Sequence, residues 1–124
     1  MLARTRGKVL LAHRDRAALR LLLERMNLAR RGPNTITARE QLMAALTKVQ
    51  ETGIAISNEE FASGVRSVAA PVRDRSGSVV AAINVAVHVS AWSAPMTAVV
   101  GRFEGPLVRT AADISARLGY RPEW

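Results

Sequence analysis

The first part of the chain has apolar residues at helical spacing. They recur every three to four positions, which predicts a short helix over residues 7–13, directly after a turn at Thr5-Arg6-Gly7. The same spacing predicts a second helix over 16–26 and a third over 38–52. Gly53 follows the third helix, where a glycine with positive φ commonly ends one. The first 53 residues are therefore predicted to be mainly helical.

Beyond Gly53 the period changes to two, which is typical of strands. Ile54 and Ile56 alternate with smaller residues, and longer strands are predicted over 65–73 and 79–88. These two longer strands are joined by residues 74–77, Asp-Arg-Ser-Gly, a turn whose glycine can take positive φ. An antiparallel hairpin is therefore the best-supported tertiary contact in the sequence.

Helical spacing returns over residues 97–118, and Gly119 follows the last turn. Gly105-Pro106 lies in the middle of this segment. Because proline removes a hydrogen bond from a helix interior, a kink or a restart is expected there. The predicted order of elements is three helices, three strands and one helix, without an internal repeat.

The hairpin turn predicts a register for its two strands. If Arg73 pairs with Ser78, then Ser67 lies opposite Asn84, Val65 opposite Ala86 and Ala69 opposite Ala82. On this face small residues would leave room beside a hydroxyl and an amide. That combination favours a pocket for a small polar ligand. The alternative is an ordinary core in which Ser67 and Asn84 satisfy each other or a buried water.

The other face of the hairpin is predicted to pack against helices. Every second residue on it is apolar, as expected for a face turned towards a core. Its residues are Val68, Ala70, Val72, Ile83, Val85 and Val87.

Composition narrows the classes of function. The 124 residues suffice for one domain with one core, and no apolar run is long enough for a membrane span, so we expect a cytoplasmic protein. The chain has no cysteine, and His13 and His88 lie far apart, so no metal and no cofactor are expected. Glu59 and Glu60 are adjacent and would point to opposite sides of an extended chain. We therefore expect no enzymatic activity.

The net charge of +8 lies entirely in the first 50 residues, which contain eleven basic and three acidic side chains. One interpretation is a phosphate-binding face, which would make the chain a basic module for non-specific nucleic-acid binding or for another interaction. The other is a solvated, arginine-rich helix surface. The sequence has no helix-turn-helix or zinc-finger motif and only five aromatic residues for stacking on bases, which favours the second interpretation.

Three stretches of the chain, taken together, indicate a family. RGKVLLA, NTITAREQLMAALTKVQETGIAIS and NEEFASGVRSVAAPVRDRSGSVVAAINVAVHVS resemble, in order and spacing, the effector-binding domain of IclR-type bacterial transcription regulators. The resemblance covers nearly the whole chain. The TIT before the third helix and the AAIN in the last strand are similar to the aromatic-catabolism branch that controls the β-ketoadipate pathway.

This resemblance implies an α/β (α+β) fold, a GAF- or profilin-like sandwich with a central antiparallel sheet flanked by helices. It implies a sensing domain for a small organic or aromatic acid that alters operator binding through rearrangement of a dimer or tetramer. DNA would be bound only through the family's N-terminal winged helix-turn-helix domain, which this sequence does not contain, and no membrane contact is implied. Residues 1–124 would thus be one partial effector-binding domain.

The resemblance also implies a ligand site. The start of the first helix would contact the acid through its backbone, and the three strands would contribute side chains to one pocket. Position by position, the site would consist of Thr5, Arg6, Ser57, Val65, Ser67, Asn84 and Ala86. Arg6 stands where a small residue is common in the family, and Ser57 where some relatives have a carboxylate, so the site favours a dianion or an aromatic acid.

The resemblance places the start of this sequence at about the first helix of the sensor domain. The opening strands of the family's sheet are then missing, which would leave a sheet edge unpaired and the pocket open on one side. An exposed edge favours pairing with another chain. We therefore expect a dimer or a higher oligomer.

Overall fold

The computed structural model describes residues 5–14, 17, 21, 39–60, 63–93 and 95–122. The helix predicted over 16–26 lies outside these ranges apart from two isolated positions. In the described part, two helices precede three strands and one helix follows them. The elements are α1 (Thr5–Ala12), α3 (Arg39–Thr52), β1 (Ala55–Asn58), β2 (Val65–Arg73), β3 (Val79–His88) and α4 (Met96–Arg117).

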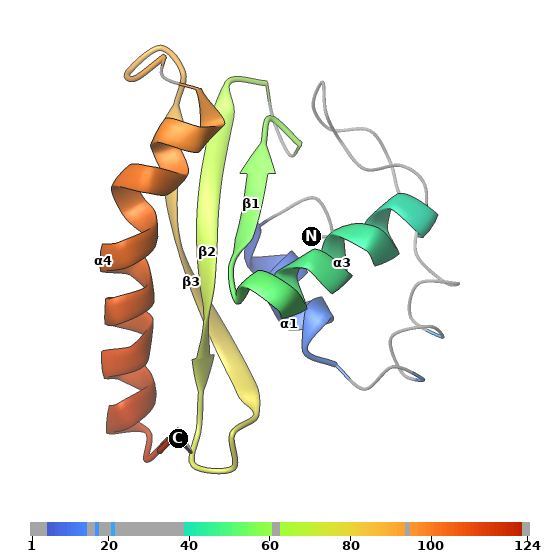
Figure 1. Cartoon of the computed structure of the whole chain (residues 1–124), viewed down its shortest axis with the longest axis vertical. Coiled ribbons are helices and arrows are strands. Elements are labelled where there is room, and N and C mark those ends of the chain that lie inside the picture. The colour runs from blue at the N-terminus through green and yellow to red at the C-terminus, as the bar shows by residue number, and fades with distance from the viewer. Residues whose placement is uncertain are drawn as a thin grey trace.

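The three strands form one antiparallel sheet in the order β1-β2-β3. Figure 1 shows α4 along one face of this sheet, with α1 and α3 on the other side. The fold is therefore α+β, as predicted, and the strands predicted over 65–73 and 79–88 are confirmed. None of the helices in the described ranges is long and apolar enough to cross a membrane.

The predicted hairpin is present, and its turn is closed by hydrogen bonds. The N–H of Asp74 donates to the carbonyl of Ser78 over 3.1 Å, and Gly77 has a φ of 85°. The Ser76 hydroxyl donates to the Asp74 carboxylate over 2.6 Å, and this hydrogen bond lowers the pKa of Asp74. The turn residues thus act as the sequence predicts.

The predicted register of the hairpin is wrong by two residues. Ser67 pairs with Ala86, Ala69 with Asn84 and Val65 with His88, so Ser67 is a diagonal neighbour of Asn84 rather than its direct partner. Arg73 pairs with Val79 rather than with Ser78, which shifts the register by one residue. A bulge between Val72 and Arg73 shifts it by one more. A shift of two leaves each side chain on its predicted face.

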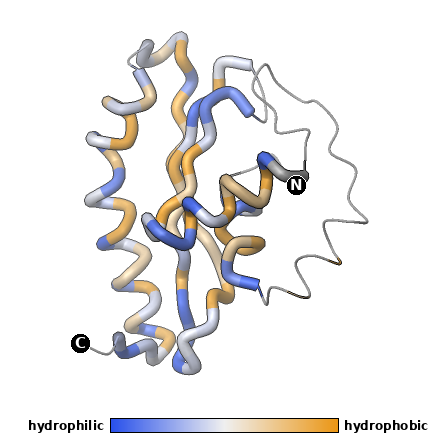
Figure 2. The backbone as a smooth tube through the Cα atoms, turned by 45° about the vertical axis from the view of Figure 1, so that its right-hand side comes forward, coloured by the Kyte–Doolittle hydropathy of each residue, from blue (hydrophilic) through white to orange (hydrophobic). Residues whose placement is uncertain are grey.

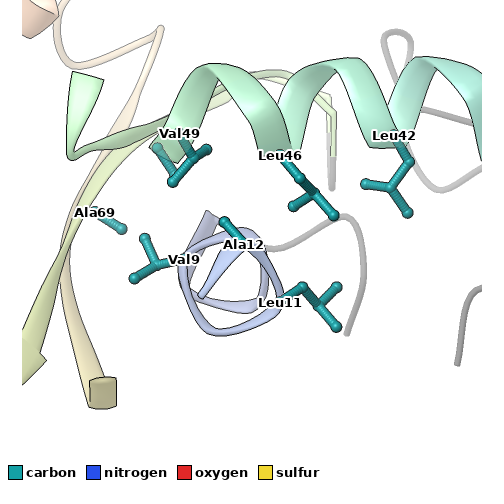
Figure 3. Close-up of a cluster of buried hydrophobic side chains, with 8 residues drawn as sticks. Val9, Leu11, Ala12, Leu42, Leu46, Val49 and Ala69 are labelled. Atoms are coloured by element: carbon teal, nitrogen blue, oxygen red, sulfur yellow. The ribbon is translucent and has the colours of Figure 1, made fainter. Parts of the chain in front are cut away.

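The first hydrophobic cluster joins α1 and α3 to the sheet. Figure 3 shows the side chains of α1 and α3 meeting each other beside Ala69 of β2. The sheet contributes alanines here, Ala55 and Ala69, both fully buried. Because alanine is small, the helices can approach the sheet closely. The cluster consists of Val9, Leu11, Ala12, Leu42, Leu46, Val49, Ala55 and Ala69.

The second cluster joins α4 to the opposite face of the sheet. Hydrophobic positions recur along α4 in Figure 2, and its Val99, Leu107 and Ala111 are buried against the strands. Val68, Ala70 and Val72 of β2 belong to this cluster, and Ile83, Val85 and Val87 of β3 pack against it. The predicted packing face of the hairpin is therefore confirmed.

The C-terminal helix runs from Met96 to Arg117 without a break, so the predicted restart at Gly105-Pro106 is wrong. Proline has no N–H, so Pro106 cannot donate the usual helical hydrogen bond to the carbonyl of Arg102. Both residues are exposed. Water can take the place of the missing donor on this side, which is why the helix tolerates the proline. Gly119, with a φ of 91°, ends the helix region as predicted.

Proline is also accommodated in the central strand, at Pro71. The Glu59 N–H donates to the carbonyl of Val65, so every second residue of β2 from Val65 onwards directs its backbone groups towards β1. The pairing of β1 ends at Ala55 and Ala69, two residues before Pro71. The proline therefore lies where the sheet needs no donor. Beyond it, the Arg73 N–H donates instead to the Ser115 hydroxyl of α4 over 2.9 Å.

Candidate functional site

The sheet brings three of the predicted ligand residues into one row. Ser57 of β1 pairs with Ser67 of β2, and Ser67 pairs with Ala86 of β3. Both serines are buried, at 3% and 6% exposure, whereas Ala86 is exposed. Directly paired residues of antiparallel strands project to the same face, so the row presents two hydroxyls beside a methyl group.

The remaining two strand residues of the predicted site lie on the same face, one pair to either side of this row. Val65 pairs with His88 and is half-buried, and Asn84 pairs with Ala69 and is exposed. The face is the one that carries Ala69 and therefore α1. All five predicted strand residues thus share a face, and their exposure rises from β1 towards β3.

Thr5 and Arg6 lie at the start of α1, which packs against all three strands. The turn predicted at Thr5-Arg6-Gly7 is wrong, because these residues already form the first turn of the helix. Their backbone N–H groups belong to a helix N-terminus, where the helix dipole favours an anion. Arg6 is exposed, whereas Gly7 and Lys8 are buried.

A buried ion pair next to this helix start was missed by the sequence interpretation. The Lys8 ammonium contacts the Glu60 carboxylate at 2.5 Å and donates to the Ile56 carbonyl over 2.9 Å. The two side chains are 4% and 13% exposed. Lys8 lies on the same side of α1 as Leu11 and Ala12, and this position on an apolar stripe is the signal that could have predicted a buried charge.

The bend between β1 and β2 is built from the other glutamate and a glycine. The Glu59 carboxylate accepts the N–H of Gly64 over 2.8 Å, and Arg66 donates to the Asn58 amide oxygen over 3.0 Å. Gly64 has a φ of 79° and its Cα faces the ring of His88. These contacts hold the ends of β1 and β2 together, beside the Lys8–Glu60 pair.

A cavity of about 630 Å³ lies at the open edge of β1, between α3 and α4. Its apolar wall is formed by residues of all three elements: Ala45, Val49, Ile54, Ile56 and Val100. Lys8, Asn58 and Glu60 also line it, and Lys48, Thr52 and Glu104 contribute further polar groups. Of the predicted ligand residues whose side chains the structure describes, none is among these lining residues.

A second, smaller cavity of about 350 Å³ lies near the C-terminal end of α4. It is lined by small residues of α4, including Ala111, Ala112 and Ser115, together with Pro71, Arg73 and Tyr120. The predicted ligand residues with described side chains do not line this cavity either.

Within the described residues, no group of three or more histidine, cysteine, aspartate or glutamate side chains is placed to hold a metal ion. His13 lies in the turn after α1, and His88 is the last residue of β3. Burial lowers the pKa of His13, and the nearby charge of Arg73 lowers it further. The Nδ1 atom of His88 accepts a hydrogen bond from the N–H of Ser90 over 3.1 Å.

A match to a family model identifies the class of protein. Residues 3–116 match the family model of the bacterial transcriptional regulator IclR C-terminal domain. The chain belongs to this family, and its relatives are transcription regulators rather than enzymes.

Individual relatives match over most of this chain. The HTH-type transcriptional regulator KdgR of Escherichia coli strain K12 is 37% identical over 114 residues, which are 92% of this chain and 42% of KdgR. The crystal structure of a putative transcriptional regulator, RHA06195 from Rhodococcus sp. RHA1, superimposes with a TM-score of 0.86 at 36% identity, covering 95% of this chain and 46% of that one. The chain therefore spans less than half of the length of these two relatives.

A third similar protein was solved with a bound small molecule. The inducer-binding domain of the PobR transcription factor from Acinetobacter was solved as a double mutant in complex with 3-hydroxybenzoic acid. It superimposes with a TM-score of 0.77 at 30% identity, covering 90% of this chain and 62% of that one.

Proposed function

We propose that this chain senses a small organic acid, most readily an aromatic one, and that the acid binds across the face formed by Ser57, Val65, Ser67, Asn84 and Ala86. The carboxylate would contact the N–H groups at Thr5 and Arg6. The strand residues would surround the rest of the molecule. Binding would then change how copies of the regulator are arranged, and through this change its affinity for an operator bound by a separate DNA-binding domain.

The observation that carries this proposal is the row of Ser57, Ser67 and Ala86 on a sheet whose three strands all contact α1. A helix N-terminus favours a carboxylate, and two hydroxyls can donate to or accept from polar groups of a ring. The small side chain of Ala86 leaves space at the exposed end of the row. A site with few polar groups in a mostly apolar lining is typical of small-molecule pockets.

Two kinds of support favour the aromatic-catabolism branch of the family. The sequence resembles the regulators of aromatic catabolism, and the similar PobR domain was solved with 3-hydroxybenzoic acid. An exposed Arg6 at the helix start adds a positive charge next to the proposed carboxylate position. We therefore expect aromatic acids to bind more tightly than short aliphatic ones.

The test is a thermal-shift and calorimetric titration of the chain with 3-hydroxybenzoate, benzoate and acetate. A ligand that binds only the folded state raises the melting temperature by mass action. We expect Asn84→Leu to abolish the shift, because it replaces the amide by an apolar group. The matched control is Gln41→Leu, which makes the same kind of change at an exposed position of α3 and should leave the shift intact. A shift that Asn84→Leu leaves unchanged contradicts the proposed site.

A further inference from the structure

The cavity at the edge of β1 has the size and lining of a small-molecule site. Its volume of about 630 Å³ lies within the range of roughly 300–1,000 Å³ that is usual for ligand pockets. Ile54, Ile56 and Val49 give it an apolar wall, and α3 and α4 stand on either side. Ile56 is 42% exposed, so an apolar side chain of the edge strand faces this space.

Four charged residues line the cavity: Lys8 and Glu60 are mostly buried, whereas Lys48 and Glu104 are exposed. Lys8 and Glu60 form an ion pair there, and the Lys8 ammonium also donates to the Ile56 carbonyl. The pair carries no net charge. A ligand ion bound against this mostly buried pair would meet no net counter-charge there, which is unfavourable. An uncharged polar group, by contrast, can both accept from the ammonium and donate to the carboxylate.

Addition of a strand from a second copy is disfavoured at this edge. Residues 59 and 65 form a hydrogen-bonded pair, so by alternation the backbone groups of Ile56 point away from β2, towards the open edge. The Ile56 carbonyl, which an added strand would need, is bonded to Lys8. A buried lysine at a sheet edge is a known obstacle to edge-to-edge pairing. The occupant that fits is therefore a small molecule.

We propose that this cavity is a second ligand site, which binds an uncharged amphipathic molecule. The apolar body of the ligand lies against Ile54, Ile56 and Val100. Its hydroxyl or amide group contacts the Lys8–Glu60 pair. This site is separate from the face proposed for the acid, and it does not depend on that assignment.

The test compares para-propylphenol with para-propylbenzoate, which have similar apolar bodies and differ in charge at neutral pH. Both are titrated into the chain and followed by proton–nitrogen NMR. We expect para-propylphenol to give saturable shifts at the amides of Ala45, Ile56 and Val100. We expect para-propylbenzoate to bind there at least about tenfold more weakly, since its charge would be uncompensated.

Two pairs of variants sharpen the result. Ala45→Phe fills the cavity and should weaken phenol binding at least about tenfold, whereas Ala44→Phe adds the same side chain at the exposed neighbouring position and should not. Glu60→Gln removes the negative member of the ion pair and should make the benzoate bind at least as tightly as the phenol. Melting curves check that each variant is folded, and only folded variants are compared.

Several outcomes would overturn the proposal. They are equal affinity for the two probes in the unchanged chain, equal losses in the Ala45 and Ala44 variants, or shifts that never saturate. If para-propylphenol shifted mainly the amide signals of Ser67 and Ala86, the binding would be assigned to the acid-sensing face instead. Shifts at the cavity amides that follow protein concentration without ligand would show contact between copies of the chain.

Discussion

Lys8 lines the edge cavity and lies two residues after Arg6 of the proposed acid site. Its ammonium contacts the Glu60 carboxylate and the Ile56 carbonyl of the edge strand β1. It thereby fixes α1 relative to β1, next to the helix start that we propose for the acid. A buried charge pair of this kind need not stabilise a fold more than apolar residues would, but breaking it is costly.

We predict that Lys8→Met lowers the free energy of unfolding by about 3 kcal/mol, because it leaves the Glu60 carboxylate buried without its cationic partner. Urea unfolding followed by circular dichroism measures this. The double variant Lys8→Met/Glu60→Leu removes both charges and should recover most of the loss. A single variant as stable as the unchanged chain would contradict a structural role for the pair.

At the scale of elements, the connections of β1 are held by glycines with positive φ on both sides. Gly53, with a φ of 81°, follows α3, and Gly64, with a φ of 79°, precedes β2. Their surroundings differ. A Cβ at Gly53 would meet no atom within 4 Å, whereas a Cβ at Gly64 would lie 2.9 Å from the His88 Nε2 atom.

This difference predicts the effect of alanine at each position. Gly53→Ala should cost about 1–2 kcal/mol, the usual penalty for a left-handed conformation. Gly64→Ala should cost more by about 1–3 kcal/mol, because the His88 ring must also move. Chemical unfolding of the two variants side by side gives the difference. Equal losses would show that the ring moves away at no cost.

At the scale of the whole molecule, the sheet has helices on both faces but an open edge. Among the described residues, no strand pairs with the outer side of β3, and Asn84, Ala86 and His88 are exposed along it. The edge of β1 differs, because Lys8 occupies one of its carbonyls. An unprotected edge is a template for pairing with another chain.

We therefore expect the chain to form a dimer through β3 at micromolar concentration, measured by size-exclusion chromatography with light scattering. Ala86→Lys places a charge in the middle of this edge and should weaken the dimer at least about tenfold. Ala112→Lys adds the same charge at an exposed position of α4 and should not. A monomer at these concentrations, or equal weakening by both variants, would contradict association through this edge.

The sequence determined the identity and order of the elements that lie within the described residues. Periods of two and 3.6 depend only on which side chains face a core, so the hairpin strands were placed to the residue. The glycine ends at Gly53 and Gly119 followed from backbone conformation in the same local way. The faces of the hairpin were also correct, because alternation survives a register shift of two.

Only the tertiary structure decided the contacts between segments that are distant in sequence. The register required the bulge at Val72 and Arg73, and the Arg73 amide found its acceptor in Ser115, 42 residues away. The pairing of Lys8 with Glu60 depends on how α1 packs against the face of the sheet. Local patterns carry no information about such distances, because the partner of a buried charge is set by the packing of whole elements.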